Sequence, residues 1–211
     1  MGNLSAMRAV TTEAELREIV KEPPRTAWAK DIGRLDEHAR TIIAHSPFVL
    51  LATSAPDGTC DVSPRGDPAG SVLVLDDDTL AVADRPGNHR LDSFRNVLHN
   101  PHVGLLFLVP GMNETLRVNG RATLVSDAPF FDDLTVKGKR PQLAIVVEVE
   151  ELYMHCAKAF LRSALWKPET WPDRTCIPTL GRIAKDQMGL KGIPAKAIDA
   201  GLALDARTNQ Y

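Results

Sequence analysis

From residue 48 onward the sequence consists of short apolar runs separated by turn signals, and this succession restricts the fold more than any other feature. Phe48 to Thr53 and Thr59 to Ser63 flank Ala55-Pro-Asp-Gly58, while Ser71 to Leu75 and Thr79 to Ala83 flank a run of aspartates. Short runs joined by such turns are typical of β-hairpins. The sequence therefore predicts antiparallel strands in this region.

Further apolar runs extend the pattern at His102 to Val109, Glu114 to Val125 and Leu143 to Val149, with a helix expected over Asn88 to Asn100. The second of these runs keeps its apolar side chains on one face only if a β-bulge lies near Gly120. No strand–helix alternation and no GxGxxG motif is present, which argues against a dinucleotide-binding Rossmann fold. We expect a mainly β fold with flanking helices (α+β), built on an antiparallel barrel of six strands.

The flanking segments have helical patterns. Thr12 to Glu15 forms a capping box, and a second periodic segment from Leu35 ends near His45, before a Ser-Pro pair. The chain of 211 residues suits one compact domain. We therefore predict a single domain over 1–211, with N-terminal helices in 1–46, the barrel in 47–152 and a C-terminal helical segment in 153–211.

Composition excludes several classes of protein. A formal net charge of −2 gives no general attraction to nucleic acid or to an anionic membrane. The apolar runs are far shorter than the roughly 20 residues that a membrane helix needs. The three cysteines and the six histidines lack the spacing of a metal site, so we expect buried thiols, no disulfide and no metal. These features favour a cytoplasmic protein.

Two basic turns flank the second hairpin and are candidates for an anion site. Arg65 lies in the first turn, and Arg85 and Arg90 lie in the second. Arginine forks and backbone N–H groups freed by glycine bind phosphate, and Asn88 is a suitable N-cap for the following helix. The nearby carboxylates of Asp61, Asp67 and Asp84 are expected to pair with Arg65 or Arg90. The alternative is that these arginines are ordinary solvated turn residues.

A second candidate stretch is HCAKAFLRSALW, residues 155–166. Lys158, Arg162 and Trp166 follow a spacing of four, which places two cations and an indole on one stripe of a helix. Such a stripe could meet a planar, phosphorylated ligand. Alternatively, the cations lie over apolar surface and the indole belongs to the core.

These residues also carry a family resemblance. Ser63-Pro-Arg-Gly-Asp67, Asp84-Arg-Pro-Gly-Asn-His-Arg-Leu-Asp-Ser93 and Cys156 to Trp166 resemble the motifs of a bacterial branch of the pyridoxamine 5′-phosphate oxidase-like flavin split-barrel family. The match extends from about Phe48 to Trp166. The resemblance implies an FMN-binding split barrel and a homodimer with flavin sites between the subunits. It places the following residues at the cofactor: Ser63, Pro64, Arg65, Asp84, Asn88, Arg90, Thr115, Arg117, Lys158, Arg162 and Trp166.

The resemblance implies an FMN-dependent oxidoreductase acting on an unidentified small molecule. The flavin itself would carry out the chemistry, so no side chain is predicted to be catalytic. The sequence after residue 200 lacks the arginine motif with which true pyridoxamine phosphate oxidases grip their substrate, so vitamin B6 oxidation is not expected. A split barrel that uses deazaflavin F420 or heme, and a flavin-binding or storage module without turnover, remain alternatives.

Overall fold

The computed structural model describes residues 7–211, which divide between Ile32 and Gly33 into two compact units. Within the first unit, α1 (Glu13–Ile19) begins with the predicted capping box, in which Thr12 and Glu15 each accept from the other's backbone. A further helix, α2 (Arg25–Ala29), follows Pro24, between the two segments that the sequence predicted to be helical. Proline suits the start of this helix because it lacks an N–H that would stay unbonded there.

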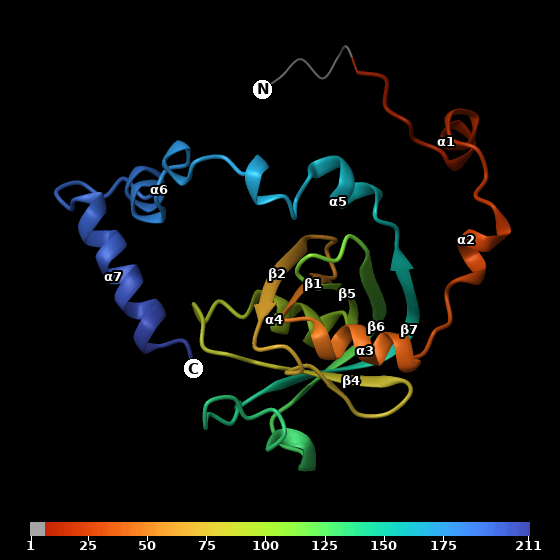
Figure 1. The fold of residues 1–211 in the computed structure, drawn as a ribbon, viewed down its shortest axis with the longest axis horizontal. Helices are drawn as coiled ribbons and strands as arrows, with labels where there is room; N and C mark the ends of the chain where they lie inside the picture. The colour runs from red at the N-terminus through yellow and green to blue at the C-terminus, as the bar shows by residue number, and fades with distance from the viewer. Residues whose placement is uncertain (1–6) are drawn as a thin grey trace. The chain divides into compact units, whose positions relative to one another are not determined.

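A seven-stranded antiparallel sheet forms the centre of the second unit within residues 7–211, in the order β2-β1-β5-β6-β7-β4-β3 (Figure 1). The predicted count of six was therefore wrong by one. Helices flank this sheet, as predicted, and the arrangement fits a split barrel. The strands are β1 (Phe48–Ser54), β2 (Cys60–Gly66), β3 (Leu73–Val74), β4 (Thr79–Ala83), β5 (His102–Leu108), β6 (Thr115–Val125) and β7 (Ala144–His155).

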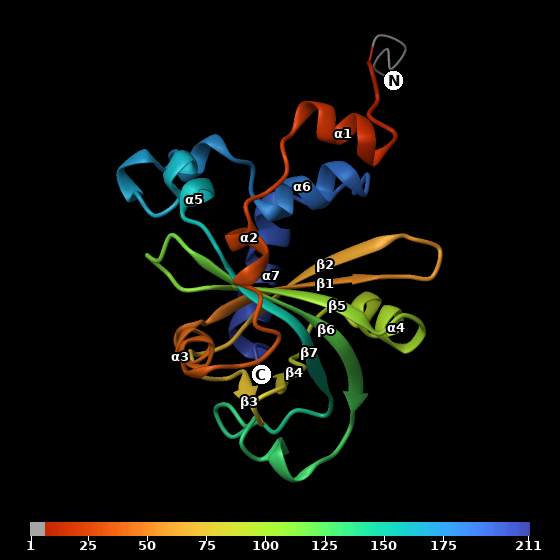
Figure 2. The same ribbon diagram turned by 90° about the vertical axis from the view of Figure 1, so that its right-hand side faces the viewer.

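The predicted β-bulge lies in β6, where its register against β7 shifts between Asn119 and Gly120. A β-carbon at Gly120 would overlap the carbonyl oxygen of Glu148 on β7. Only glycine fits this close approach of two backbones. The bulge bends the longest strand pair of the sheet (Figure 2), and β7 continues to His155, beyond the predicted end of this strand.

The main core lies between the curved sheet and two helices, α3 (Glu37–His45) and α4 (Asp92–His99). The Asp36 carboxylate caps α3 by accepting from the Ala39 N–H at 2.8 Å. Alternating side chains of the strands point into this core, as the period of two requires. Its fully buried members include Leu35, Ile43, Leu51, Leu80, Leu105, Phe107, Leu116, Val118, Ile145 and Val147.

The start of α4 differs from the prediction. The helix begins at Asp92 rather than after Asn88, because His89 and Leu91 have φ angles of 56° and 59°. These left-handed residues cannot continue a right-handed helix. Asn88 is therefore not the N-cap. Its side-chain oxygen instead accepts a 3.0 Å hydrogen bond from the backbone N–H of Arg90.

A 3₁₀ turn at Pro129–Phe131 lies between β6 and β7. After β7 come the helices α5 (Lys158–Ser163), α6 (Leu180–Gln187) and α7 (Ala195–Thr208), with 3₁₀ turns at Pro168–Thr170 and Arg174–Cys176. α6 and α7 form a hairpin in which Asp199 accepts from the backbone N–H of Gly181 at 2.7 Å. None of the helices in the described residues is long and apolar enough to cross a membrane.

The cysteines differ from the prediction of buried thiols. Within the described chain Cys60, Cys156 and Cys176 are unpaired, as predicted, but all three are exposed. Cys60 lies on β2, which is an edge strand of the sheet, and the other two lie in the segments around the short helices. A position at an edge or in a short turn has too few neighbours to bury a thiol.

Candidate functional site

A cavity of about 650 Å³ lies between the β2 strand, the loop that joins β4 to α4 and the turn before β7. It is lined by five of the predicted site residues, which come from segments about twenty residues apart: Ser63, Arg65, Asp84, Asn88 and Arg90. The volume lies within the range of about 300–1,000 Å³ that is typical of small-molecule and cofactor sites. The two basic turns therefore meet at one cavity.

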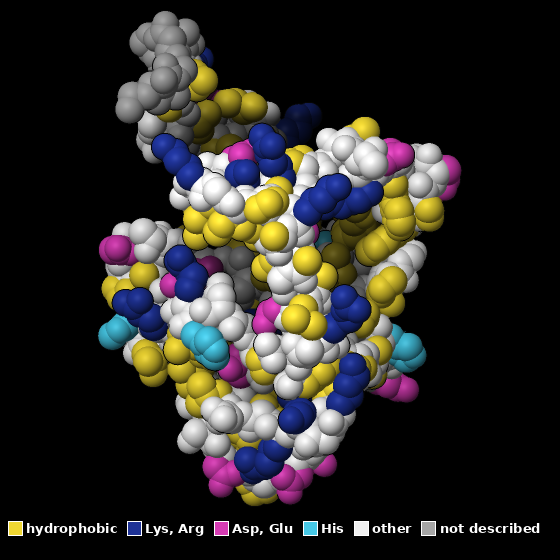
Figure 3. All heavy atoms as spheres, turned by 90° about the vertical axis from the view of Figure 1, so that its left-hand side faces the viewer, with side chains coloured by type: hydrophobic (Ala, Val, Ile, Leu, Met, Phe, Trp, Pro, Cys, Tyr) yellow, Lys and Arg dark blue, Asp and Glu magenta, His cyan; other side chains and the backbone are white. Residues whose placement is uncertain are grey.

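Cationic side chains outnumber carboxylates around this cavity. Among the described residues five cations line it, Arg65, Arg85, Arg90, Lys139 and Arg140, against three carboxylates, Asp61, Asp84 and Asp92. Four of these cations already pair with carboxylates, Arg85 and Arg140 with ones just outside the lining, so among the described residues Lys139 is the lining cation whose charge is not paired. An unpaired cation in a concave site attracts anions. On the face shown in Figure 3, Lys and Arg side chains lie scattered among acidic and apolar ones.

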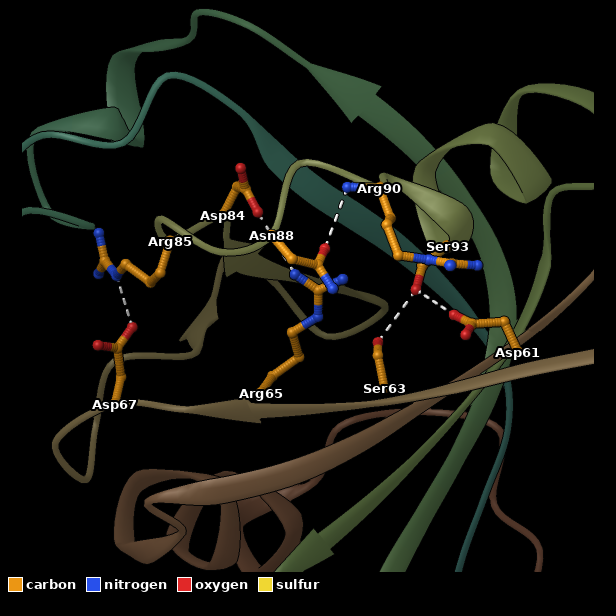
Figure 4. A network of polar contacts seen from close by, with 9 residues as sticks. All are labelled: Asp61, Ser63, Arg65, Asp67, Asp84, Arg85, Asn88, Arg90 and Ser93. Carbon is orange, nitrogen blue, oxygen red and sulfur yellow. Dashed lines mark hydrogen bonds and ion pairs between the residues drawn. The ribbon is translucent and has the colours of Figure 1, made fainter. Parts of the chain in front are cut away.

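Carboxylates hold the arginines of both turns in place (Figure 4). Arg65 Nη1 lies 3.4 Å from Asp84 Oδ1, which confirms one predicted pair, and its guanidinium lies over the Phe94 ring. Arg85 Nε donates to Asp67 Oδ2 at 2.7 Å, so Asp67 pairs with Arg85 rather than with Arg65 or Arg90. Such pairs fix the orientation of an arginine before a ligand arrives.

Arg90 is the most exposed of these arginines, with 71% of its side chain accessible. Its Nε donates to Asp92 Oδ2 at 2.7 Å, within the loop that leads into α4. This local pair raises the pKa of the Arg90 guanidinium, first through the hydrogen bond that Arg90 donates to Asp92 and then through the negative charge of Asp92. Because Arg90 is exposed, it can turn toward a ligand in the cavity at little cost.

Burial raises the pKa of Asp84 above its ordinary value, because a carboxylate loses solvation when it leaves water. The positive charge of Arg65 and the backbone N–H of Arg85 act in the opposite direction, but desolvation is the larger effect. The ion pair with Arg65 therefore does not fully offset the loss of solvation of the Asp84 carboxylate. A further positive group beside Asp84, or protonation of the Asp84 carboxylate, would reduce this cost of desolvation.

Asp61 has a partner other than the predicted arginine. Its Oδ2 accepts a 2.6 Å hydrogen bond from the Ser93 hydroxyl, and Ser93 Oγ lies 3.0 Å from Ser63 Oγ. Since a hydroxyl has one hydrogen and Ser93 donates it to Asp61, Ser63 is the donor to Ser93. Ser63 therefore offers only lone pairs to the cavity. It suits a ligand N–H or O–H group and not a phosphate oxygen.

The first turn of α4 also contributes residues to the wall of this cavity. Asp92, Ser93 and Phe94 line the cavity, and in the described chain no side chain caps the N–H groups of the first helical turn. Unbonded N–H groups at a helix N-terminus stabilise negative charge. The negative charge of Asp92, in the first turn, neutralises part of this positive potential.

Sequence reasoning missed the turn before β7, which contributes Lys139, Arg140 and Gln142 to the cavity wall. Arg140 is held by Asp127 and Asp132, at 2.6 and 2.9 Å. Lys139 is exposed and makes no ion pair with any described residue. The signal was available in the sequence, because residues 137–142 read KGKRPQ, a third basic turn with a glycine.

Thr115 and Arg117 lie apart from this cavity, on β6. Thr115 is buried in the sheet. Arg117 Nη2 donates to Glu151 Oε2 at 3.0 Å, and its guanidinium lies 4.1 Å from the centre of the Tyr153 ring. Within a single chain of 7–211 the structure therefore does not bring these two residues to the others.

The stretch from Lys158 to Trp166 does not form the predicted stripe. α5 ends at Ser163 because Ala164 is left-handed, with a φ of 51°, so Trp166 lies beyond the helix. The Trp166 indole stacks on Phe160 and donates to the Met112 carbonyl at 2.7 Å, which makes it a packing residue within this chain. Lys158 and Arg162 are exposed, and neither lines the cavity.

A smaller cavity of about 290 Å³ adjoins the larger one. It includes Pro64, the remaining predicted residue of the first turn, and lies between the start of β1, the end of β2 and the end of β4. The residues that line both cavities are Arg65, Arg85, Pro86, Gly87 and Tyr211.

One protein-family model matches the part of the chain that contains the sheet and the larger cavity. The model of the pyridoxamine 5′-phosphate oxidase family matches residues 35–156, a segment that contains α3, the sheet, and the larger cavity's loops. The chain belongs to this family. The match ends at Cys156, so the α5–α7 segment lies outside it. No curated protein matches the sequence.

Solved structures of similar fold include three of bacterial origin. A candidate pyridoxamine 5′-phosphate oxidase from Lactobacillus delbrueckii is 23% identical, with a TM-score of 0.46, and covers 59% of this chain and 98% of its own. HupZ from Group A Streptococcus is 15% identical (TM-score 0.45; 56% and 90%). General Stress Protein 26 from Bacillus anthracis is 17% identical (TM-score 0.42; 54% and 88%).

Proposed function

We propose that this member of the pyridoxamine 5′-phosphate oxidase family binds FMN and transfers electrons between the flavin and an unidentified small molecule. The observation that carries the proposal is the cavity of about 650 Å³ at which the two predicted phosphate-binding turns meet and which Arg65, Arg90 and the unpaired Lys139 line. A phosphorylated, planar cofactor requires both positive charge and room for a ring system. Both are present beside the residues predicted from the sequence.

In this proposal the phosphate lies between Arg65, Lys139 and the backbone N–H groups at the start of α4. Arg65 is fixed by Asp84 and Phe94, so it offers a preorganised fork, whereas Lys139 supplies an unpaired charge. Arg90 approaches the same anion by leaving Asp92. Ser63 accepts from an N–H or O–H group of the cofactor, which orients it relative to the phosphate.

FMN supplies the redox chemistry when bound, by accepting or donating a hydride or electrons. The protein positions it and excludes water. Positive charge around the cavity favours the anionic character that the flavin gains on reduction. No side chain of this chain is assigned as a general acid or base.

We also propose a homodimer with the flavin sites at the subunit interface. Within one subunit Lys158, Arg162 and Arg117 lie apart from the larger cavity. The exposed cations of α5 are free to approach the FMN of a second subunit. Analytical ultracentrifugation with and without FMN tests this, and a monomer in both states would contradict it.

The visible absorption spectrum of the purified protein tests the cofactor. We expect twin flavin bands that persist after addition of FMN and desalting, that bleach on reduction by dithionite, and that recover in air. A single band near the violet edge would indicate deazaflavin F420 and a sharp, intense Soret band would indicate heme. Flavin that stays bound, but that no small-molecule donor or acceptor turns over, would support a storage module instead.

A further inference from the structure

Two polar atoms at the smaller cavity are buried without a hydrogen-bond partner in the described chain, Asp67 Oδ1 and Arg65 Nε. Both side chains rise on the same side from the end of β2 and the residue after it, toward the loop that follows β4 (Figure 4). A buried polar atom without a partner has lost its hydration and gained no hydrogen bond in return. Such atoms at a cavity indicate that a ligand supplies the missing partners.

The two atoms need opposite chemical groups. A carboxylate oxygen such as Asp67 Oδ1 only accepts hydrogen bonds, whereas Arg65 Nε only donates. The ligand must therefore bring an N–H or O–H group for the first atom and an acceptor such as a carbonyl oxygen for the second. A carboxamide or a cyclic amide has both groups side by side in one plane.

The charges of these two side chains are already paired. Asp67 Oδ2 accepts from Arg85 Nε at 2.7 Å, and both of these side chains are only 14% exposed. Arg65 pairs with Asp84 at 3.4 Å. A charged ligand would meet a like charge in each pair, and breaking a largely buried ion pair is costly. The cavity therefore favours a polar ligand without net charge.

The remainder of the wall suits the body of such a ligand. Phe48, Val72, Val82 and Pro86 contribute apolar surface around a volume of about 290 Å³. An apolar cavity of about 150 Å³ accommodates benzene. A ring that bears an amide therefore fits, with the ring on the apolar part of the wall and the amide toward Asp67 and Arg65.

Tyr211 lies at the boundary with the larger cavity and beside Asp67. Burial and the Asp67 carboxylate raise the pKa of the Tyr211 hydroxyl. The contacts that hold this end of the chain are long: the ring centre lies 4.7 Å from Lys137 Nζ and 5.8 Å from Arg85 Cζ, and Lys137 Nζ lies 3.4 Å from Gln210 Oε1. Exposed contacts of this kind are weak, so Tyr211 can move aside and uncover Asp67.

We propose that the smaller cavity binds a neutral ring molecule that carries a carboxamide or cyclic amide. Its N–H donates to Asp67 Oδ1, its carbonyl oxygen accepts from Arg65 Nε, and Tyr211 moves aside to admit it. This ligand is separate from the occupant of the larger cavity, and the site does not rest on the proposed FMN function.

The first test compares three probes by ligand-observed NMR and calorimetry. Benzamide has both groups, acetophenone replaces its NH₂ with a methyl group of similar size, and benzylamine is a cation without the carbonyl. We expect saturable binding of benzamide, and binding of the other two that is weaker by about tenfold or more, because each leaves a buried group unpaired. Equal affinities for benzamide and acetophenone, or no saturable binding of benzamide, would overturn the proposal.

Asp67→Asn assigns the donor contact to its residue. The asparagine oxygen is expected to accept from Arg85 Nε, which turns its NH₂ group to the place of Oδ1 and replaces an acceptor by a donor. The preference for benzamide over acetophenone should fall from about tenfold to about onefold. Asp186→Asn, the same change on α6 outside both cavities, is the control and should keep the preference. A preference that survives in Asp67→Asn would contradict the assignment.

Fluorine NMR locates the binding without a change at the cavity. The chain has two tyrosines, Tyr153 and Tyr211, and Tyr153 on β7 lines neither cavity. In protein labelled with fluorotyrosine, Tyr211→Phe identifies the Tyr211 resonance. Benzamide should shift this resonance with the saturation seen by calorimetry and leave that of Tyr153 in place. A saturable affinity with no shift of the Tyr211 resonance would place the ligand elsewhere and overturn the proposal.

The same titrations with saturating FMN separate this site from the proposed flavin site. We expect the benzamide affinity to stay within about threefold of its value without FMN, since a factor of three is under 1 kcal/mol. Loss of benzamide binding in the presence of FMN would assign the two atoms to the flavin ring and overturn a separate site. Benzamide binding by a protein that does not retain FMN would contradict the proposed function alone.

Discussion

The two basic regions of this chain differ in how the structure places their side chains. In the turns around Arg65 and Arg90, side chains distant in sequence converge on one cavity, and carboxylates hold the arginines. In the stretch from Lys158 to Trp166, the helix ends early, the cations face outward and the indole packs on its own chain. Convergence of separate segments, rather than helical spacing, distinguishes a built site from a charged surface.

The largest expected effect concerns the first region. Arg65→Ala removes a fixed, partly buried guanidinium, and we expect FMN affinity to fall by about 1.5–3 kcal/mol, the scale of a hydrogen bond to a charged group. Fluorescence titration of FMN measures this, with Arg121→Ala, an exposed arginine on β6 that does not line the cavity, as the matched control. Equal affinity in the two variants would return Arg65 to the class of ordinary turn arginines.

A smaller effect is expected for Trp166→Phe. This change keeps the aromatic contact with Phe160 but removes the 2.7 Å hydrogen bond to the Met112 carbonyl, so the free energy of unfolding should fall by about 1 kcal/mol. Urea unfolding of the protein without FMN measures it. An unchanged stability together with weaker FMN binding would mean that the indole serves the cofactor and not the packing.

The pH dependence of the stability of Asp84→Asn tests whether desolvation of the Asp84 carboxylate outweighs its ion pair with Arg65. Because the folded-state pKa of Asp84 is raised, protonation favours the folded state, and this benefit is lost as pH rises from the ordinary value of 3.8 through the raised one. The variant should therefore match or slightly exceed the wild-type melting temperature at pH 7. This relative gain should shrink as the pH falls through that window. A variant that is less stable at pH 7 would show that the pair with Arg65 outweighs desolvation.

The smallest effect is expected for Lys158→Ala and Arg162→Ala. Both side chains are exposed, so the free energy of unfolding of the monomer should change by no more than about 0.5 kcal/mol. FMN titration at protein concentrations above and below dimer dissociation sharpens the comparison. Weaker FMN binding only in the dimer would assign these cations to the second subunit's site, and no change in either state would leave them as surface charges.

Local patterns predicted much of this structure. The capping box at Thr12, the hairpins and the bulge at Gly120 each depend on neighbouring residues or on side-chain period, which the sequence displays directly. The start of α4 was not predictable in this way, because left-handed φ at His89 and Leu91 is unusual for such residues. Likewise, Ala164 favours helices yet adopts a left-handed conformation that ends α5.

The sequence predicted part of the candidate site, and the remainder escaped for a related reason. Glycine, proline and arginine in the two turns indicated an anion site, but which carboxylate pairs with which arginine depends on how β2 and the loop after β4 meet in space. Lys139 lies about fifty residues farther along the chain, and only the fold brings it to the same cavity. Contacts between distant segments therefore account for most of what the sequence did not predict.

The central claim is that the cavity between the two basic turns holds FMN. The most direct measurement is the visible absorption spectrum of the protein after incubation with excess FMN and desalting. The account predicts twin flavin bands in a ratio of one FMN per chain, strongly reduced in Arg65→Ala. A colourless protein after desalting, or full retention of flavin by that variant, would contradict it.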